Sequence, residues 1–245
     1  YYETDPALQE ALMQRCFKNN VSRLFLPNVD SASVPMVLEL AKKYPDNCFP
    51  MMGLHPCNVK INFHEELDFI RQAIQKNKIY AIGEIGIDLY WDKTTLEIQQ
   101  EAFRLQINLA KALDLPIVIH CRDAFDEVYT ILLEEKDEKL RGIFHCFTGT
   151  KEQAGRIIEL GFYLGIGGVL TYKNSGLDKV VAQLDLKHLV LETDSPYLAP
   201  VPYRGKSNES SYLVHVAEKV SDLLQLPVKE IAHVTTENSR QIFGI

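Results

Sequence analysis

The sequence lacks the features that mark membrane, secreted and multidomain proteins. No apolar run reaches the roughly 18 residues that a membrane-spanning helix needs, so no membrane association is predicted. Residues 1–6 have neither a basic flank nor an apolar stretch, so no secretory signal is visible. There is no low-complexity segment and no linker rich in proline, glycine or serine. We therefore predict a single domain over residues 1–245.

Paired cysteines and an excess of positive charge are also missing. The 5 cysteines are an odd set without a CxxC pair, which is typical of a reducing compartment and predicts a cytoplasmic protein. The net charge of −7 argues against a protein that coats nucleic acid through a broad basic face. An enzyme that meets DNA locally stays possible, because bound metal ions can reverse the sign of the field at a pocket.

The apolar residues form short runs that alternate with amphipathic helical stretches. Most of these runs are nearly continuous in Val, Ile, Leu and Phe, as expected of parallel strands that are buried on both faces. The expected strands are residues 22–29, 48–55, 79–85, 115–120, 141–145, 162–167 and 188–192. Thr94 with Glu97, and Thr150 with Gln153, have the spacing of a capping box, and Gly161 has the position of a glycine that ends a helix.

Repeated strand–helix units leave two α/β architectures, an open doubly wound sheet and a closed barrel. Polar residues lie at or just after the ends of at least five expected strands, and in a barrel all these ends share one face. An open sheet would spread them along an edge. The residues are His55, Glu84, His120, Arg122, His145 and Asp194. Their distribution favours a (β/α)₈ TIM barrel.

Four of these residues are of types that bind metal ions. The imidazoles of His120 and His145 and the carboxylates of Glu84 and Asp194 suit Zn, Mn, Fe or Ni, and a carboxylate can bridge two ions. Taken singly, each has an ordinary explanation: a hydrogen-bonded histidine, a salt-bridged glutamate, or an aspartate in an Asx turn or N-cap. Together, on separate strand–helix units, they predict a metal site.

Other residues near the expected strand ends have two interpretations each. His55 is either a donor to a phosphate oxygen or a strand cap, and Arg122 either binds phosphate with its planar guanidinium or pairs with a nearby aspartate. Tyr90 and Trp91 either stack on a base or pack as a lid. Strand alternation predicts that Cys121 and Cys146, which follow the two ligand-type histidines, belong to the core.

Five sequence runs together resemble the successive signatures of the TatD family of metal-dependent deoxyribonucleases. They are GLHP (53–56), AIGEIGID (81–88), VIHCRDA (118–124), FHCFTG (144–149) and LETDSPYL (191–198), and the segment from Ala199 to Glu209 also fits. The resemblance spans nearly the whole chain. It implies a TIM barrel of the amidohydrolase kind, metal binding by Glu84, His120, His145 and Asp194, and DNA as the substrate.

One departure from the family pattern concerns its first strand, which ends in a His-x-His pair that binds a metal. This sequence contains no His-x-His. A barrel without one strand would expose two unpaired edges. We therefore expect that one strand, about ten residues, is absent from this chain.

The predicted reaction is two-metal hydrolysis of phosphodiester bonds in DNA or an oligonucleotide, by an exonuclease that uses Mg, Mn or Zn. Glu84 is expected to bridge the ions, with His120 and His145 on one of them, and Asp194 to act as ligand and general base. His55, Arg122 and Arg204 are expected to hold the substrate, and no obligate protein partner is predicted. Two alternatives stay open: hydrolysis of a small amide, ester or lactone, and a scaffold protein without catalysis.

Overall fold

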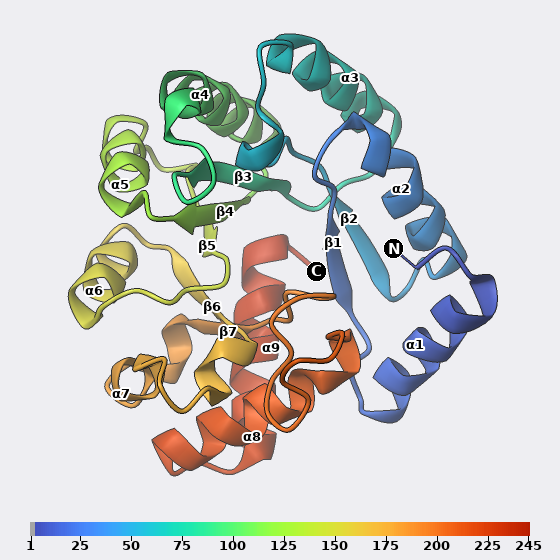
Figure 1. The fold of residues 1–245 in the computed structure, drawn as a ribbon, viewed down its shortest axis with the longest axis vertical. Coiled ribbons are helices and arrows are strands. Elements are labelled where there is room, and N and C mark those ends of the chain that lie inside the picture. Colours follow the sequence, from blue (N-terminus) through green and yellow to red (C-terminus); the bar gives the residue numbers. More distant parts are fainter. Residues whose placement is uncertain (1–2) are drawn as a thin grey trace. The chain divides into compact units, whose positions relative to one another are not determined.

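The computed structural model describes residues 3–245, and Tyr1 and Tyr2 lie outside the described residues. The chain divides into two compact units, one formed by residues 23–143 and the other by residues 3–22 together with 144–245. Both units contain helices and parallel strands (Figure 1). The single domain over residues 1–245 stays a prediction.

The first unit holds β1 to β4 and most of β5. Its strands are β1 (Leu24–Pro27), β2 (Cys48–Met51), β3 (Ile82–Asp88), β4 (Ile117–Arg122) and β5 (Gly142–Phe144), whose last residue belongs to the second unit. Its helices are α2 (Val34–Lys43), α3 (Phe63–Lys76), α4 (Leu96–Leu113) and α5 (Phe125–Glu134), with short 3₁₀ turns at Ser31–Ser33, Pro56–Asn58 and Lys93–Thr95. β1 pairs with β2, and β3 pairs with β4, in parallel.

Helix α4 packs along β3 and supports the chain at two points. Ala102, Phe103 and Ile107 are buried on its inner face. On the same helix Gln99 and Gln106 are each only 2% exposed. Their spacing of seven residues places them on one side of the helix, two turns apart. The burial of its apolar residues therefore fixes the position of α4. The same helix places the side-chain amides of Gln99 and Gln106 near the ends of β3 and β2, respectively.

The second unit holds the remaining strands and helices. Its strands β6 (Tyr163–Ile166) and β7 (Leu189–Leu191) pair in parallel. Its helices are α1 (Pro6–Lys18), α6 (Lys151–Glu159), α7 (Leu177–Val181), α8 (Leu213–Leu224) and α9 (Val228–Phe243), with 3₁₀ turns at Gly168–Thr171, Leu186–His188 and Ser210–Tyr212. α1 contacts the turn before α8, where Asn19 Nδ2 donates to the carbonyl of Ser211 at 3.1 Å.

The predicted helix caps are partly confirmed. Thr150 and Gln153 form the expected capping box, and Gly161 follows α6 with a φ of +87°. The capping box of Thr94 with Glu97 is wrong. Asp92 instead accepts the amide of Thr94 and begins a 3₁₀ turn, so α4 starts only at Leu96.

The strand bounds differ most at β3, which was expected over residues 79–85. Residues 79 and 81 are apolar and buried, but they precede the strand, which begins at Ile82. At its other end the strand continues to Asp88, because it pairs with β4 as far as that residue. Glu84 and His120 therefore lie within strands, whereas His55, His145 and Asp194 follow theirs. Among residues 3–245, none of the helices combines the length and apolar character that a bilayer crossing requires.

Candidate metal centre

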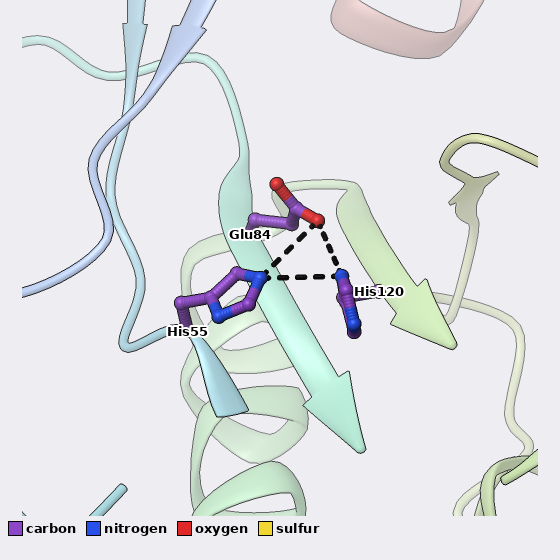
Figure 2. Close-up of side chains that lie close together, drawn as sticks. All are labelled: His55, Glu84 and His120. Carbon is purple, nitrogen blue, oxygen red and sulfur yellow. Dashed lines mark hydrogen bonds and ion pairs between the residues drawn. The ribbon is translucent and has the colours of Figure 1, made fainter. Parts of the chain in front are cut away.

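Three side chains in the first unit point toward one another (Figure 2). His55 comes from the segment after β2, Glu84 from β3 and His120 from β4. His120 Nδ1 lies 3.0 Å from Glu84 Oε1 and 3.2 Å from His55 Nε2, and His55 Nε2 lies 3.6 Å from the same carboxylate oxygen. Their side chains are only 15%, 10% and 18% exposed. We name these three residues the β3–β4 cluster.

Asp88 determines which nitrogen of His120 faces the β3–β4 cluster. Its Oδ2 lies 2.8 Å from His120 Nε2. Burial alone would raise the pKa of Asp88, but the hydrogen bond and charge of His120, together with the amides of Trp91 and Tyr90, lower this pKa to about 2. The ionised carboxylate therefore accepts the Nε2–H, and the lone pair of a neutral His120 ring lies on Nδ1.

In a neutral His120 ring that carries its proton on Nε2, the contact of Nδ1 with Glu84 joins two acceptors. A lone pair on Nδ1 and a carboxylate oxygen at 3.0 Å repel each other unless a proton or a cation lies between them. Imidazole nitrogen and carboxylate oxygen are both ligands for Zn and similar divalent ions. The donor set of His120 and Glu84 therefore fits a metal ion.

A neutral His55 ring presents a hydrogen-bond donor to the β3–β4 cluster, whereas a neutral His120 ring presents an acceptor. The amide of Cys57 donates to its Nδ1 at 3.2 Å, so the proton of a neutral His55 ring lies on Nε2, which faces Glu84 and His120. Burial alone would lower the pKa of His55, but side-chain hydrogen bonds with the Cys57 thiol and with Glu84, together with the negative charge of Glu84, raise it. His55 therefore offers the β3–β4 cluster a donor, as the sequence interpretation of a phosphate-binding histidine requires.

Backbone hydrogen bonds from α4 hold two of these segments. Gln106 accepts from the amide of Leu54 at 2.7 Å and donates to its carbonyl at 3.2 Å, directly before His55. Gln99 makes the same pair of bonds with Asp88, at 2.8 and 3.1 Å. Buried polar groups of this kind are costly unless they are paired, so α4 fixes the position of both segments.

A second group lies in the second unit and contains His145, Glu192 and Asp194. His145 Nδ1 lies 3.0 Å from Glu192 Oε2, and its Nε2 lies 3.5 Å from Asp194 Oδ1. Glu192 Oε1 also accepts from the amide of Cys146 at 2.7 Å. Glu192 therefore directs the Nε2 of His145 toward Asp194. We name these three residues the β7 cluster.

Glu192 and Asp88 were not among the predicted site residues, although a signal for each was present. Asp88 lies four residues after Glu84 in β3, and even spacing along a strand places side chains on one face, whereas Glu192 lies two residues before Asp194 in the segment that follows β7. The cysteines were predicted as core, and this is wrong: Cys121 and Cys146 are both partly exposed, and Cys146 lies within 4.8 Å of ligand atoms of His145 and Glu192. A positive φ of 46° takes Cys146 out of strand alternation.

The two predicted arginines lie in different units. Arg122, at the end of β4, places its guanidinium 3.7 Å from the centre of the Tyr90 ring. Arg204 lies 4.4 Å from the ring centre of Tyr172 in the second unit. The structure thus brings together His55, Glu84 and His120 in one unit, and His145 and Asp194 in the other. That all of them serve one centre stays a prediction.

Comparisons with known proteins agree with this chemistry. Residues 2–244 match the family model of TatD-related DNases. The chain is 41% identical over 245 residues to the Bacillus subtilis metal-dependent hydrolase YabD, covering 100% of this chain and 94% of the relative.

Two solved structures have the same fold. The Escherichia coli TatD homologue YjjV superposes with a TM-score of 0.93 at 30% identity, covering 100% of this chain and 95% of its own. A TatD-family hydrolase from Entamoeba histolytica has a TM-score of 0.84 at 24% identity, with 99% and 90% coverage. The predicted TIM-barrel fold is therefore confirmed. The chain belongs to the TatD family of metal-dependent hydrolases.

Proposed function

We propose that this protein is a metal-dependent deoxyribonuclease that hydrolyses phosphodiester bonds as an exonuclease. The observation that carries the proposal is the contact of His120 Nδ1 with Glu84 Oε1 at 3.0 Å, beside a histidine that presents a donor. A cation held by Glu84 and His120, together with the donor of His55, would suit a phosphate group, which carries negative charge and accepts hydrogen bonds.

The proposed ligands are Glu84, His120, His145 and Asp194, with two divalent ions of Mg, Mn or Zn. When bound, such ions activate water as a nucleophile near neutral pH and neutralise the charge that develops on phosphorus. Asp194, whose side chain is 33% exposed, is the proposed general base that takes the proton of the attacking water.

The remaining proposed residues hold the substrate. His55 donates from Nε2 to a non-bridging phosphate oxygen, since its Nδ1 is engaged by the amide of Cys57. Arg122 and Arg204, both exposed residues, contact the strand through their guanidinium groups. These cations matter because the whole chain has a net charge of −7 and otherwise repels DNA.

The test compares DNA with small molecules in one assay. The purified protein is incubated with labelled oligonucleotides and with a panel of amides, esters and lactones, in Mg²⁺, Mn²⁺ or Zn²⁺ and in chelator. The proposal expects metal-dependent shortening of the oligonucleotide from one end. Turnover restricted to the amide or lactone panel would favour the small-molecule alternative and overturn the nuclease proposal.

A further inference from the structure

Two large aromatic side chains are exposed directly after β3. Trp91 is 72% exposed and Tyr90 is 52% exposed. The guanidinium of Arg122 lies 3.7 Å from the Tyr90 ring centre and 5.7 Å from that of Trp91. The two rings meet edge to face, with centroids 4.9 Å apart and an interplanar angle of 89°. We name Tyr90, Trp91 and Arg122 the aromatic platform.

The aromatic platform is tied to the β3–β4 cluster through Asp88. One oxygen of Asp88 accepts the amides of Tyr90 and Trp91 at 3.0 and 3.2 Å, and the other contacts His120 Nε2 at 2.8 Å. Asp88 also lies opposite Arg122 in the register of β3 and β4. The same carboxylate therefore fixes both the exposed turn and a proposed metal ligand, all within the first unit.

The sequence interpretation of Tyr90 and Trp91 as lid packing conflicts with this exposure. A packed lid would bury most of each ring, because burial of a large aromatic side chain is favourable. These rings instead remain in water. The planar cation that stacks on Tyr90 supplies positive charge at the same place. Flat apolar surface combined with positive charge is how proteins bind single strands without reading their sequence.

We infer that the aromatic platform is a nucleobase subsite, in which Trp91 stacks on a base of the strand whose phosphate lies at the β3–β4 cluster. This inference rests on the proposed function, since it requires a polynucleotide substrate. Arg122 has two roles in it: it orients the Tyr90 ring and it neutralises a phosphate of the stacked nucleotide. Stacking of this kind tolerates every base, because each base has a flat face.

Trp91 is the only tryptophan of the chain, so its fluorescence reports on the subsite directly. The wild-type protein is titrated, in the presence of Mn²⁺, with a short phosphorothioate-linked oligothymidylate, which resists hydrolysis, and with an abasic strand of equal length. Anisotropy of a dye on each strand measures binding independently. We expect saturable quenching by the strand that carries bases and no quenching by the abasic strand.

The outcomes separate this inference from the proposed function. Cleavage of DNA without quenching of Trp91 overturns the subsite and leaves the nuclease intact. Quenching without cleavage supports stacking and overturns the nuclease. Equal quenching by both strands, or no binding by anisotropy, also overturns the subsite.

A kinetic test uses Trp91→Ala with Phe69→Ala as the matched control. Phe69 is an aromatic residue of α3 in the same unit and is 47% exposed. Removing a stacked aromatic is expected to raise KM for a single-stranded oligonucleotide between about 5-fold and about 100-fold, with kcat nearly unchanged. Trp91→Phe should restore most of the loss, and Phe69→Ala should match the wild type. An unchanged KM in Trp91→Ala would overturn the subsite.

Discussion

Glu192 offers a sharp test of how the β7 cluster is organised. Both of its carboxylate oxygens are engaged, one by His145 Nδ1 at 3.0 Å and one by the amide of Cys146 at 2.7 Å. The side chain also lies against Gly165, where an added Cβ would collide with Oε2. Its position is therefore fixed from three sides, and it fixes the orientation of the His145 ring.

The perturbation is Glu192→Gln, which keeps the shape of the side chain and removes its charge. The amide of glutamine accepts at only one position, so either His145 or Cys146 loses its acceptor. Loss of a carboxylate that orients a ligand histidine typically weakens metal affinity by about 10- to 100-fold, or about 1.4–2.7 kcal/mol. The hydrogen bond itself is expected to contribute about 1.5–3 kcal/mol to folding.

The assay is titration of the apo protein with Zn²⁺ or Mn²⁺ against a competing chelator, alongside urea unfolding. His215 and Glu218 supply the control, because they form the same kind of pair at 3.1 Å with Glu218 61% exposed. Glu218→Gln should leave metal affinity unchanged, since exposed pairs contribute little. If a folded Glu192→Gln protein bound metal as tightly as the wild type, the orienting role of Glu192 would be refuted.

Three further predictions concern catalysis, backbone space and pH. Asp194→Asn should abolish metal-dependent turnover because the amide cannot accept a proton, and a near-normal rate of hydrolysis would exclude its role as base. Gly86 has a φ of +144° and a Cβ there would collide with the backbone of β4, so Gly86→Ala should lower the free energy of unfolding by about 2 kcal/mol or more in urea denaturation. Gly155→Ala, in open space within α6, should instead raise it by about 0.5–1 kcal/mol. Burial alone would raise the pKa of Glu209, but hydrogen bonds from Arg15 and a nearby serine lower it below its ordinary value, which applies to the unfolded chain. Its stabilising contribution is therefore present above that unfolded-state value and is lost as pH falls through the folded-state pKa, so wild type and Glu209→Gln should converge in stability in acid.

The strand–helix alternation could be predicted because strands that are buried on both faces have nearly continuous apolar sequences. β3 shows where this signal ends: residues 79 and 81 are apolar and buried, yet the strand begins only at Ile82. Burial is what the apolar pattern reports, whereas strand bounds depend on hydrogen bonds with a neighbour. The same limit applies to the expected capping box of Thr94 and Glu97. The Thr94 amide, which the Glu97 side chain would accept in that box, is instead accepted by Asp92.

The candidate ligands Glu84, His120, His145 and Asp194 could be proposed from the sequence, whereas the contacts that position them could not. The stacking of Arg122 on Tyr90 depends on the register of β3 and β4, which no local pattern specifies. The buried amides of Gln99 and Gln106 left a weak signal, since two polar residues seven apart interrupt an otherwise apolar helix face. Their role is visible only in the structure, which shows their hydrogen bonds to the backbone of Leu54 and Asp88.

Hydrogen bonding separates the proposed ligands from the carboxylates that support them. Both oxygens of Asp88 are taken, one by two amides and one by the His120 ring, and both oxygens of Glu192 are taken by an amide and the His145 ring. Their negative charge is thus already matched by donors. Glu84 Oε1 instead lies 3.0 Å from His120 Nδ1 and 3.6 Å from His55 Nε2, and in a neutral His120 ring with its proton on Nε2 a cation or a proton completes the first contact. The same rule explains why His120 presents Nδ1 whereas His145 presents Nε2: in each ring the supporting carboxylate takes the proton-bearing nitrogen and leaves the other for a metal.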